Sequence, residues 1–152
     1  MVNERANRMT WPRGRSRYNL AMITELGVFR PIDFGLTLDG AEIEYEAMLV
    51  AIGNGTSYGG GMRVCPGARV DDGQFHVTVL ERVSKVEFLR VFPAVYSGTH
   101  IENPKVHVLT ARRVDLVADG VVAYADGERV GPLPVSCTTV RGALNVLSPP
   151  LT

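Results

Sequence analysis

The chain has 152 residues, of which 45% are hydrophobic and 21% are charged, which is the composition of one soluble globular domain. Its sixteen basic and sixteen acidic residues cancel, and this argues against nucleic acid as a main partner because phosphate binding usually requires a basic excess. We therefore expect a single domain over residues 1–152.

The first 17 residues are rich in arginine and contain one acidic residue, Glu4; the basic positions are Arg5, Arg8, Arg13, Arg15 and Arg17. Two interpretations remain open, a solvated arm or a patch that faces anionic lipid or a partner. Residues 16–29 follow with apolar side chains at four-residue steps, Tyr18, Met22 and Leu26, before Pro31. This spacing predicts a first helix that ends ahead of the proline.

Beyond Pro31 the hydrophobic period shifts toward two, which predicts strands. Apolar residues alternate over 34–38, and the turn sequence "LDGA" follows. The run "EIEYEAMLVAIGN" alternates first and is then continuously apolar, as in a strand buried on both faces. The run "GQFHVTVLE" predicts another strand, with Phe75, Val77 and Val79 facing one way and His76, Thr78 and Leu80 the other.

A second helix is predicted to begin at Ser84, since Ser84 and Glu87 have the spacing of a capping box, and Pro93 should bend or shorten it. The run "KVHVLTARRVDLVADGVVAYADGERVG" predicts strand, turn, strand, turn, and "LPVSCTTVRGALNVL" one or two closing strands. Short strands separated by Asp-Gly and Gly-rich turns are typical of a β-sandwich or a compact barrel. The expected fold is mainly β, with two helices.

Cysteine usage and hydropathy predict a cytoplasmic protein. Cys65 and Cys137 lie 72 residues apart in strand-like runs, which fits buried free thiols and neither a disulfide framework nor a zinc site. No run approaches the roughly 20 apolar residues of a membrane span. The start "MVNERANRMTWPRGRSR" also lacks the apolar core of a signal peptide.

The most unusual segment, residues 51–73, is a glycine-rich loop. Its glycines cluster around Asn54 at Gly53, Gly55, Gly59, Gly60 and Gly61. It lacks the Gly-Lys-Ser/Thr ending of a phosphate loop and the spacing of the dinucleotide fingerprint. Two interpretations stay open, a loop whose backbone approaches something closely and a tight sandwich crossover. Asp71 and Asp72, beside Gly73, form either a plain turn or a site for a hard cation.

Taken together, several motifs resemble the C-terminal half of bacterial diacylglycerol kinases, in the diacylglycerol/sphingosine kinase family. The matching stretches are "IGNGTSYGGGMRVCPGARVDDGQFHVTVLE", then "DGERV", and at the end "RGALNVLSPP". The resemblance implies the β-sandwich-like C-terminal domain of a two-domain lipid kinase. The family's Gly-Gly-Asp-Gly-Thr motif, which binds ATP in the N-terminal domain, is absent here. The resemblance therefore suggests a truncated chain that begins inside the second domain and is inactive by itself.

The family's reaction, transfer of the ATP γ-phosphate to diacylglycerol to give phosphatidic acid, implies roles for individual residues. Glu128 corresponds to the presumed general base, and Asp126 and Gly127 to the turn that aims it. Magnesium would be held by the Asp72 side chain and by the backbone carbonyls of Arg69 and Gln74. Residues that would line the cofactor side are Asn54, Gly59, Gly60 and Gly61.

Partners and alternatives follow from the same resemblance. The lipid substrate would be diacylglycerol, with a sphingoid base or another lipid alcohol as the alternative, and the protein would work at the inner membrane face. A different class of function is a non-catalytic β-sandwich that binds lipid or a partner protein. Unpaired strand edges of a truncated sandwich would favour a homo-oligomer.

Overall fold

The computed structural model describes residues 30–58 and 60–145. Within these residues the chain forms eight strands, one α-helix and one 3-10 helix, namely β1 (Ile32–Leu38), β2 (Ala41–Gly53), β3 (Phe75–Glu81), α3 (Lys85–Ala94), η1 (Thr99–Glu102), β4 (Val106–Ala111), β5 (Arg113–Val117), β6 (Val122–Ala125), β7 (Glu128–Pro132) and β8 (Val135–Thr138). The first predicted helix, residues 16–29, lies outside the described residues. The mainly β fold class is confirmed.

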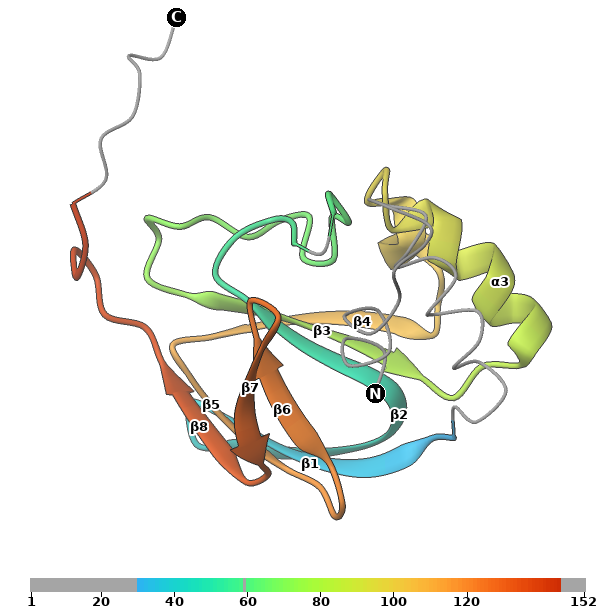
Figure 1. Ribbon diagram of the computed structural model, residues 1–152, viewed down its shortest axis with the longest axis horizontal. Coiled ribbons are helices and arrows are strands. Elements are labelled where there is room, and N and C mark those ends of the chain that lie inside the picture. The colour runs from blue at the N-terminus through green and yellow to red at the C-terminus, as the bar shows by residue number, and fades with distance from the viewer. Residues whose placement is uncertain (1–29, 59, 146–152) are drawn as a thin grey trace, which may run out of the picture.

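Six of the strands form one antiparallel sheet in the order β4-β3-β2-β1-β5-β8, and β6 pairs with β7 as a separate hairpin. In Figure 1 the β6–β7 hairpin crosses the large sheet, and its turn points toward the end of the molecule that carries the β2–β3 loop. Helix α3 lies at the edge of the sheet formed by β3 and β4. Among the described residues, β4 and β8 each pair on one side only. Self-association through these edges stays a prediction.

The alternation that predicts β1 reflects a strand with one buried face. Phe34, Leu36 and Leu38 are buried, and β1 pairs along its whole length with β2. The two strands are joined by Asp39 and Gly40, with φ angles of 50° and 93°. Positive φ at both central residues is typical of a type I′ turn, so the predicted turn is confirmed.

Strand β3 is covered on both of its faces. Val77 and Val79 are fully buried on one side, as predicted, but Thr78 and Leu80 on the other are also buried. The second face is covered by α3 and by the β2–β3 loop, whose buried side chains pack there. The alternation of the two sets of side chains is as predicted, and the burial of both sets at the centre of the strand is what the structure adds.

Three groups of buried side chains form the core. The largest combines residues of β1 to β5 with Ala118, namely Phe34, Leu36, Leu38, Ala47, Val77, Val79, Ala111, Val114, Leu116 and Ala118. The second lies under α3 and consists of Met48, Leu80, Val83, Phe88, Val91 and Val106. The third lies under the β2–β3 loop and consists of Ala51, Met62, Val64, Cys65 and Ala68. The glycine-rich loop is thus packed on the sheet.

Helix α3 begins where the capping box predicts. Ser84 is its N-cap, and the Ser84 hydroxyl accepts a hydrogen bond from the Glu87 amide at 3.1 Å. Pro93 lies in the last turn, and the helix ends one residue later, at Ala94. Among the described residues no helix has the length and apolar character that crossing a membrane requires.

The predictions for the two cysteines need correction. Cys65 is a buried free thiol, as predicted, but it lies in a bend of the β2–β3 loop and not in a strand. Cys137 lies in a strand, β8, as predicted, but it is only partly buried. The closing segment was predicted to form one or two strands and forms one, β8, which ends at Thr138; residues 139–145 form a turn with irregular flanks.

Candidate functional site

The Asp-Gly-Glu motif forms the tip of the β6–β7 hairpin. Asp126 and Gly127 have φ angles of 49° and 89°, which again is typical of a type I′ turn. Glu128 follows directly as the first residue of β7, paired with Ala125. The turn that the sequence predicts is therefore present, and it fixes the backbone from which the Glu128 side chain extends.

The Glu128 carboxylate is unengaged within the described part of the chain. The residue is exposed, and among residues 30–58 and 60–145 its side chain has no hydrogen bond or ion pair. A carboxylate in this setting keeps its full capacity to accept a hydrogen bond from an incoming hydroxyl. Its assignment as a general base stays a prediction.

The proposed cation loop, residues 67–74, carries the three predicted metal-binding residues. The Asp72 carboxylate accepts a hydrogen bond from the Gln74 amide at 2.9 Å through Oδ1, and Oδ2 has no hydrogen bond to the other described residues. The side chain of Arg69 is directed to Asp71, with 3.3 Å between Nε and Oδ1. The Arg69 guanidinium holds the pKa of the Asp71 carboxyl below its usual range. Of the two carboxylates, Asp71 is therefore the one that forms an ion pair with Arg69 within the described part of the chain.

These residues fit magnesium by the chemistry of their donors. One carboxylate oxygen and two backbone carbonyls form an all-oxygen set, and Mg²⁺ typically binds through one or two carboxylates while keeping several waters. No group of three or more histidine, cysteine or acidic side chains gathers as a metal centre within the described residues. A magnesium ion here would depend on carbonyl groups, which leave little trace in a sequence.

The glycine-rich loop contains the close approach that was one of its two interpretations. A Cβ on Gly53 would lie 2.8 Å from Cys65 Sγ, so only glycine lets the end of β2 pass the buried thiol. Further along, Tyr58 and Met62 pair through two backbone hydrogen bonds of 3.1 and 3.0 Å. Gly60 and Gly61, with φ angles of 81° and 90°, lie in the tip between them, and Gly59 lies outside the described residues.

The backbone carbonyl of Val64 anchors the loop to both β3 and η1. Val64 O accepts hydrogen bonds from Thr78 Oγ1 at 2.9 Å and from His100 Nε2 at 3.1 Å. Because a carbonyl can only accept, Nε2 carries the proton, and His100 Nδ1 has no partner within the described residues. Burial lowers the pKa of His100 and raises that of the Cys65 thiol, so both groups are held in their neutral forms.

The sequence did not reveal this anchor because its members are far apart along the chain. His100 is 4% exposed and Thr78 is 1% exposed, yet they are 22 positions apart and belong to different elements. A buried threonine in an otherwise apolar strand was the available signal, because a buried hydroxyl requires a partner.

A pocket of about 180 Å³ brings two of the predicted motifs together. Asn54 lines it from the end of β2, and Asp71 and Gly73 line it from the cation loop. The remaining lining residues come from the loop, β3 and the C-terminal segment, namely Val70, Phe75, Thr138, Thr139, Val140, Arg141 and Gly142. Glu128 is not one of its lining residues. The structure thus joins Asn54 to the cation loop, and no residue of the Asp-Gly-Glu turn lines this pocket.

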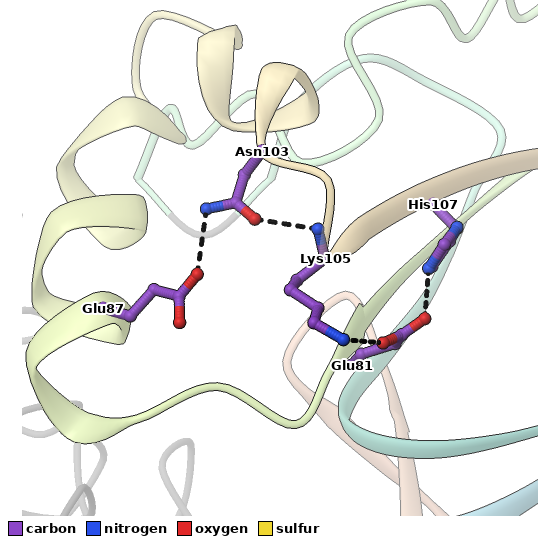
Figure 2. Close-up of polar contacts among 5 residues, drawn as sticks. All are labelled: Glu81, Glu87, Asn103, Lys105 and His107. Carbon is purple, nitrogen blue, oxygen red and sulfur yellow. Dashed lines mark hydrogen bonds and ion pairs between the residues drawn. The ribbon is translucent and has the colours of Figure 1, made fainter.

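A second polar network ties β3 and β4 together near α3, as Figure 2 shows. Glu81 lies between Lys105, at 2.8 Å from Nζ, and His107, at 2.5 Å from Nε2. Nearby, Asn103 accepts from the Lys105 amide and donates to Glu87, a residue of α3. Lys105 and then His107 lower the pKa of Glu81. The network joins the helix to the sheet, and no predicted site residue belongs to it.

Comparison with known proteins identifies the domain. Residues 1–148 match the family described as the YegS C-terminal NAD kinase beta sandwich-like domain. The chain belongs to this family. Over 150 residues it is 43% identical to a protein of Mycobacterium tuberculosis (strain ATCC 25618 / H37Rv) named diacylglycerol kinase, covering 98% of the chain and 48% of that relative. A Bacillus subtilis (strain 168) protein of the same name is 28% identical over 137 residues, which cover 90% of the chain and 45% of the relative.

Solved structures agree on the fold. A crystal structure of a diacylglycerol kinase from Bacillus anthracis str. Sterne matches with a TM-score of 0.57 and 22% identity, covering 78% of this chain and 43% of that one. Another crystal structure from the same organism matches with a TM-score of 0.63 and 20% identity, covering 82% and 41%. The predicted resemblance to the C-terminal half of diacylglycerol kinases is therefore confirmed for the family and the fold. The chain spans about half the length of the relatives that it matches.

Proposed function

We propose that this chain is the C-terminal domain of an ATP-dependent lipid kinase that phosphorylates diacylglycerol to phosphatidic acid. The observation that carries the proposal is the Asp-Gly-Glu turn, which presents an exposed carboxylate with no partner among residues 30–58 and 60–145. The domain that carries it is 43% identical to half of a protein named diacylglycerol kinase. The domain supplies the general base and the cation loop. An ATP-binding domain supplies the nucleotide.

In the proposed reaction Glu128 accepts the proton of the lipid hydroxyl. The hydroxyl oxygen forms a bond to the γ-phosphorus of ATP while the bond from that phosphorus to the bridging oxygen breaks, giving phosphatidic acid and ADP. The proton remains on the Glu128 carboxyl until water removes it. Asp126 and Gly127 contribute through the positive φ angles of their turn, which direct β7 and hence the Glu128 side chain.

Magnesium would be held by Asp72 and by the carbonyls of Arg69 and Gln74, and would supply charge neutralisation and a fixed loop geometry. Asn54, which lines the pocket beside this loop, and Gly60 and Gly61 form the side that we assign to the nucleotide. Diacylglycerol is a membrane lipid, so the enzyme works at the inner membrane face. The arginine-rich start, a candidate for that contact, lies outside the described residues.

Activity of a chimera tests the proposal. The part of the Mycobacterium tuberculosis relative that this chain does not match is fused to the 152-residue chain. The chimera, and the chain alone, are then given radiolabelled ATP with diacylglycerol, a sphingoid base or another lipid alcohol. The proposal predicts phosphatidic acid from the chimera and no product from the chain alone. A folded chimera that labels only another alcohol changes the substrate, and one that labels none supports the alternative, a non-catalytic lipid-binding or partner-binding module.

A further inference from the structure

The cation loop is tied to a segment 66 positions away in the sequence. The Thr139 hydroxyl donates a hydrogen bond to the carbonyl oxygen of Gly73 at 2.7 Å. The Thr139 amide donates to Arg112 O at 3.0 Å, just before β5. Thr139 is therefore fixed to the sheet by its backbone and to the loop by its side chain.

The hydroxyl has one hydrogen to donate, and its two neighbouring acceptors are at unequal distances. Gly73 O lies at 2.7 Å and Arg112 O at 3.4 Å, so the shorter bond to the loop takes the hydrogen. Gly73 lies between the two proposed ligand residues Asp72 and Gln74, which are themselves joined across it by the 2.9 Å bond. The Gly73 carbonyl and the Gln74 amide belong to one planar peptide group, so fixing the carbonyl also fixes the N–H that binds the Asp72 carboxylate.

The side chain of Arg141 packs on the same glycine. Gly73 has a φ of 73°, and a Cβ there would lie 2.7 Å from Arg141 Cγ and 2.9 Å from Cδ. Only a residue without a side chain both adopts this backbone conformation readily and leaves room for the arginine stem. Thr139 and Arg141 thus contact the loop from one side, and both line the pocket that also contains Asp71.

We propose that Thr139 is a positioning residue that holds the cation loop in its magnesium-binding geometry, an inference that rests on the magnesium site of the proposed function. The Thr139 hydroxyl does not bind the ion. It fixes the Gly73 carbonyl, so that the Asp72 carboxylate and the Gln74 carbonyl keep their relative positions before magnesium arrives. Because coupling between two sites is reciprocal, magnesium binding also stabilises residues 139–144 against local opening.

Magnesium titration of matched variants tests the proposal. The 152-residue chain is titrated with MgCl₂ at constant ionic strength, and affinity is read from calorimetry and from the rise in Tm. Thr139→Val keeps the shape and removes the hydroxyl, Thr139→Ser restores the hydroxyl, and Thr138→Val is the neighbouring control. The Thr138 side chain is exposed and has no hydrogen bond among the described residues.

The expected result is that Thr139→Val binds Mg²⁺ about three- to tenfold more weakly, from the loss of one positioning hydrogen bond. Thr139→Ser and Thr138→Val should match the unaltered chain. In the unaltered chain, amide hydrogen exchange of residues 140–144 should slow when Mg²⁺ is added, a readout that needs no variant to fold.

Two different failures remain distinguishable. The first failure is that the unaltered chain binds Mg²⁺ and Thr139→Val binds it equally well, or that Mg²⁺ does not change the rate of amide hydrogen exchange at residues 140–144. Either result overturns the positioning role and leaves the magnesium site in place. If the unaltered chain shows no response to Mg²⁺, both the positioning role and the magnesium site are overturned. The general-base role of Glu128 is unaffected by either result.

Discussion

The hydrogen bond between Thr78 and Val64 makes a sharp prediction about stability. Thr78 is 1% exposed in β3, and its hydroxyl donates to Val64 O at 2.9 Å while Cys65 Sγ lies 3.4 Å away. Replacing Thr78 by valine keeps the branched shape and removes only the hydroxyl. The variant therefore measures what this bond contributes to holding the glycine-rich loop on the sheet.

The expected cost is modest because the carbonyl keeps a second donor. Val64 O still accepts from His100 Nε2 at 3.1 Å, and the Cys65 thiol keeps His76 O as an acceptor at 3.4 Å. Loss of one net hydrogen bond without an orphaned partner lowers the free energy of unfolding by about 1 kcal/mol, roughly fivefold in the unfolding equilibrium. Removing both donors leaves the carbonyl buried and unpaired, which adds about 1–2 kcal/mol beyond the sum of the single changes.

Urea unfolding at pH 7.5, followed by circular dichroism, provides the measurement for Thr78→Val, His100→Leu and the double variant. Thr110→Val on the adjacent strand β4 is the control, because Thr110 is exposed and has no side-chain hydrogen bond among the described residues. The control should stay within about 0.5 kcal/mol of the unaltered chain. If Thr78→Val behaves like the control and the double variant is additive, Val64 O does not anchor the loop.

Two more predictions concern the same loop. Burial lowers the folded-state pKa of His100 below its ordinary 6.5, so the unfolded chain takes up the proton first as the pH falls. The free energy of unfolding should therefore be retained above pH 6.5 and fall below it, and it should fall less in His100→Gln. If the free energy of unfolding from urea curves drops by the same amount between pH 7.5 and 5.5 in both proteins, the prediction is contradicted. Gly53→Ala should lower the free energy of unfolding by about 1–3 kcal/mol, because the new Cβ would lie 2.8 Å from Cys65 Sγ. Gly55→Ala is the control, since the nearest contact of a Cβ there is 3.7 Å. Equal stability of the two variants would show that the approach at Gly53 is not tight.

Local signals carried most of the secondary structure in the described residues. The alternation over β1, the apolar second half of β2 and the capping box at Ser84 each depend on neighbours within a few positions, and each is confirmed. The Asp-Gly pairs at 39–40 and 126–127 adopt the positive φ angles of type I′ turns. These features could be predicted because the physical cause and the sequence pattern occupy the same short stretch.

Contacts between distant segments could not be predicted in this way. Asp39, interpreted from sequence as a plain turn residue, accepts hydrogen bonds from the amides of Arg112 and Arg113, more than 70 positions away. These two bonds hold the pKa of the Asp39 carboxyl below its usual range. The same holds for the Thr139 contact with Gly73, and for the covered second face of β3, because each depends on how the loop and the C-terminal segment pack on the sheet.

In the candidate site, too, the local features could be predicted from the sequence and the contacts between distant segments could not. The type I′ turn at Asp126 and Gly127 followed from a motif of adjacent residues, whereas the pocket that joins Asn54 to the cation loop requires the C-terminal segment as its third wall. Backbone ligands such as the carbonyls of Arg69 and Gln74 carry no side-chain signature, so only resemblance to a family pointed to them.

The most direct test of the central proposal is the turnover of diacylglycerol by the chimera with Glu128→Gln, beside the matched variant Glu42→Gln. Glu42 is another exposed glutamate without a side-chain partner among the described residues. Loss of a general base predicts a rate lower by about 100-fold or more for Glu128→Gln, with unchanged circular dichroism, and no change for Glu42→Gln. Full activity of a folded Glu128→Gln chimera would contradict the account.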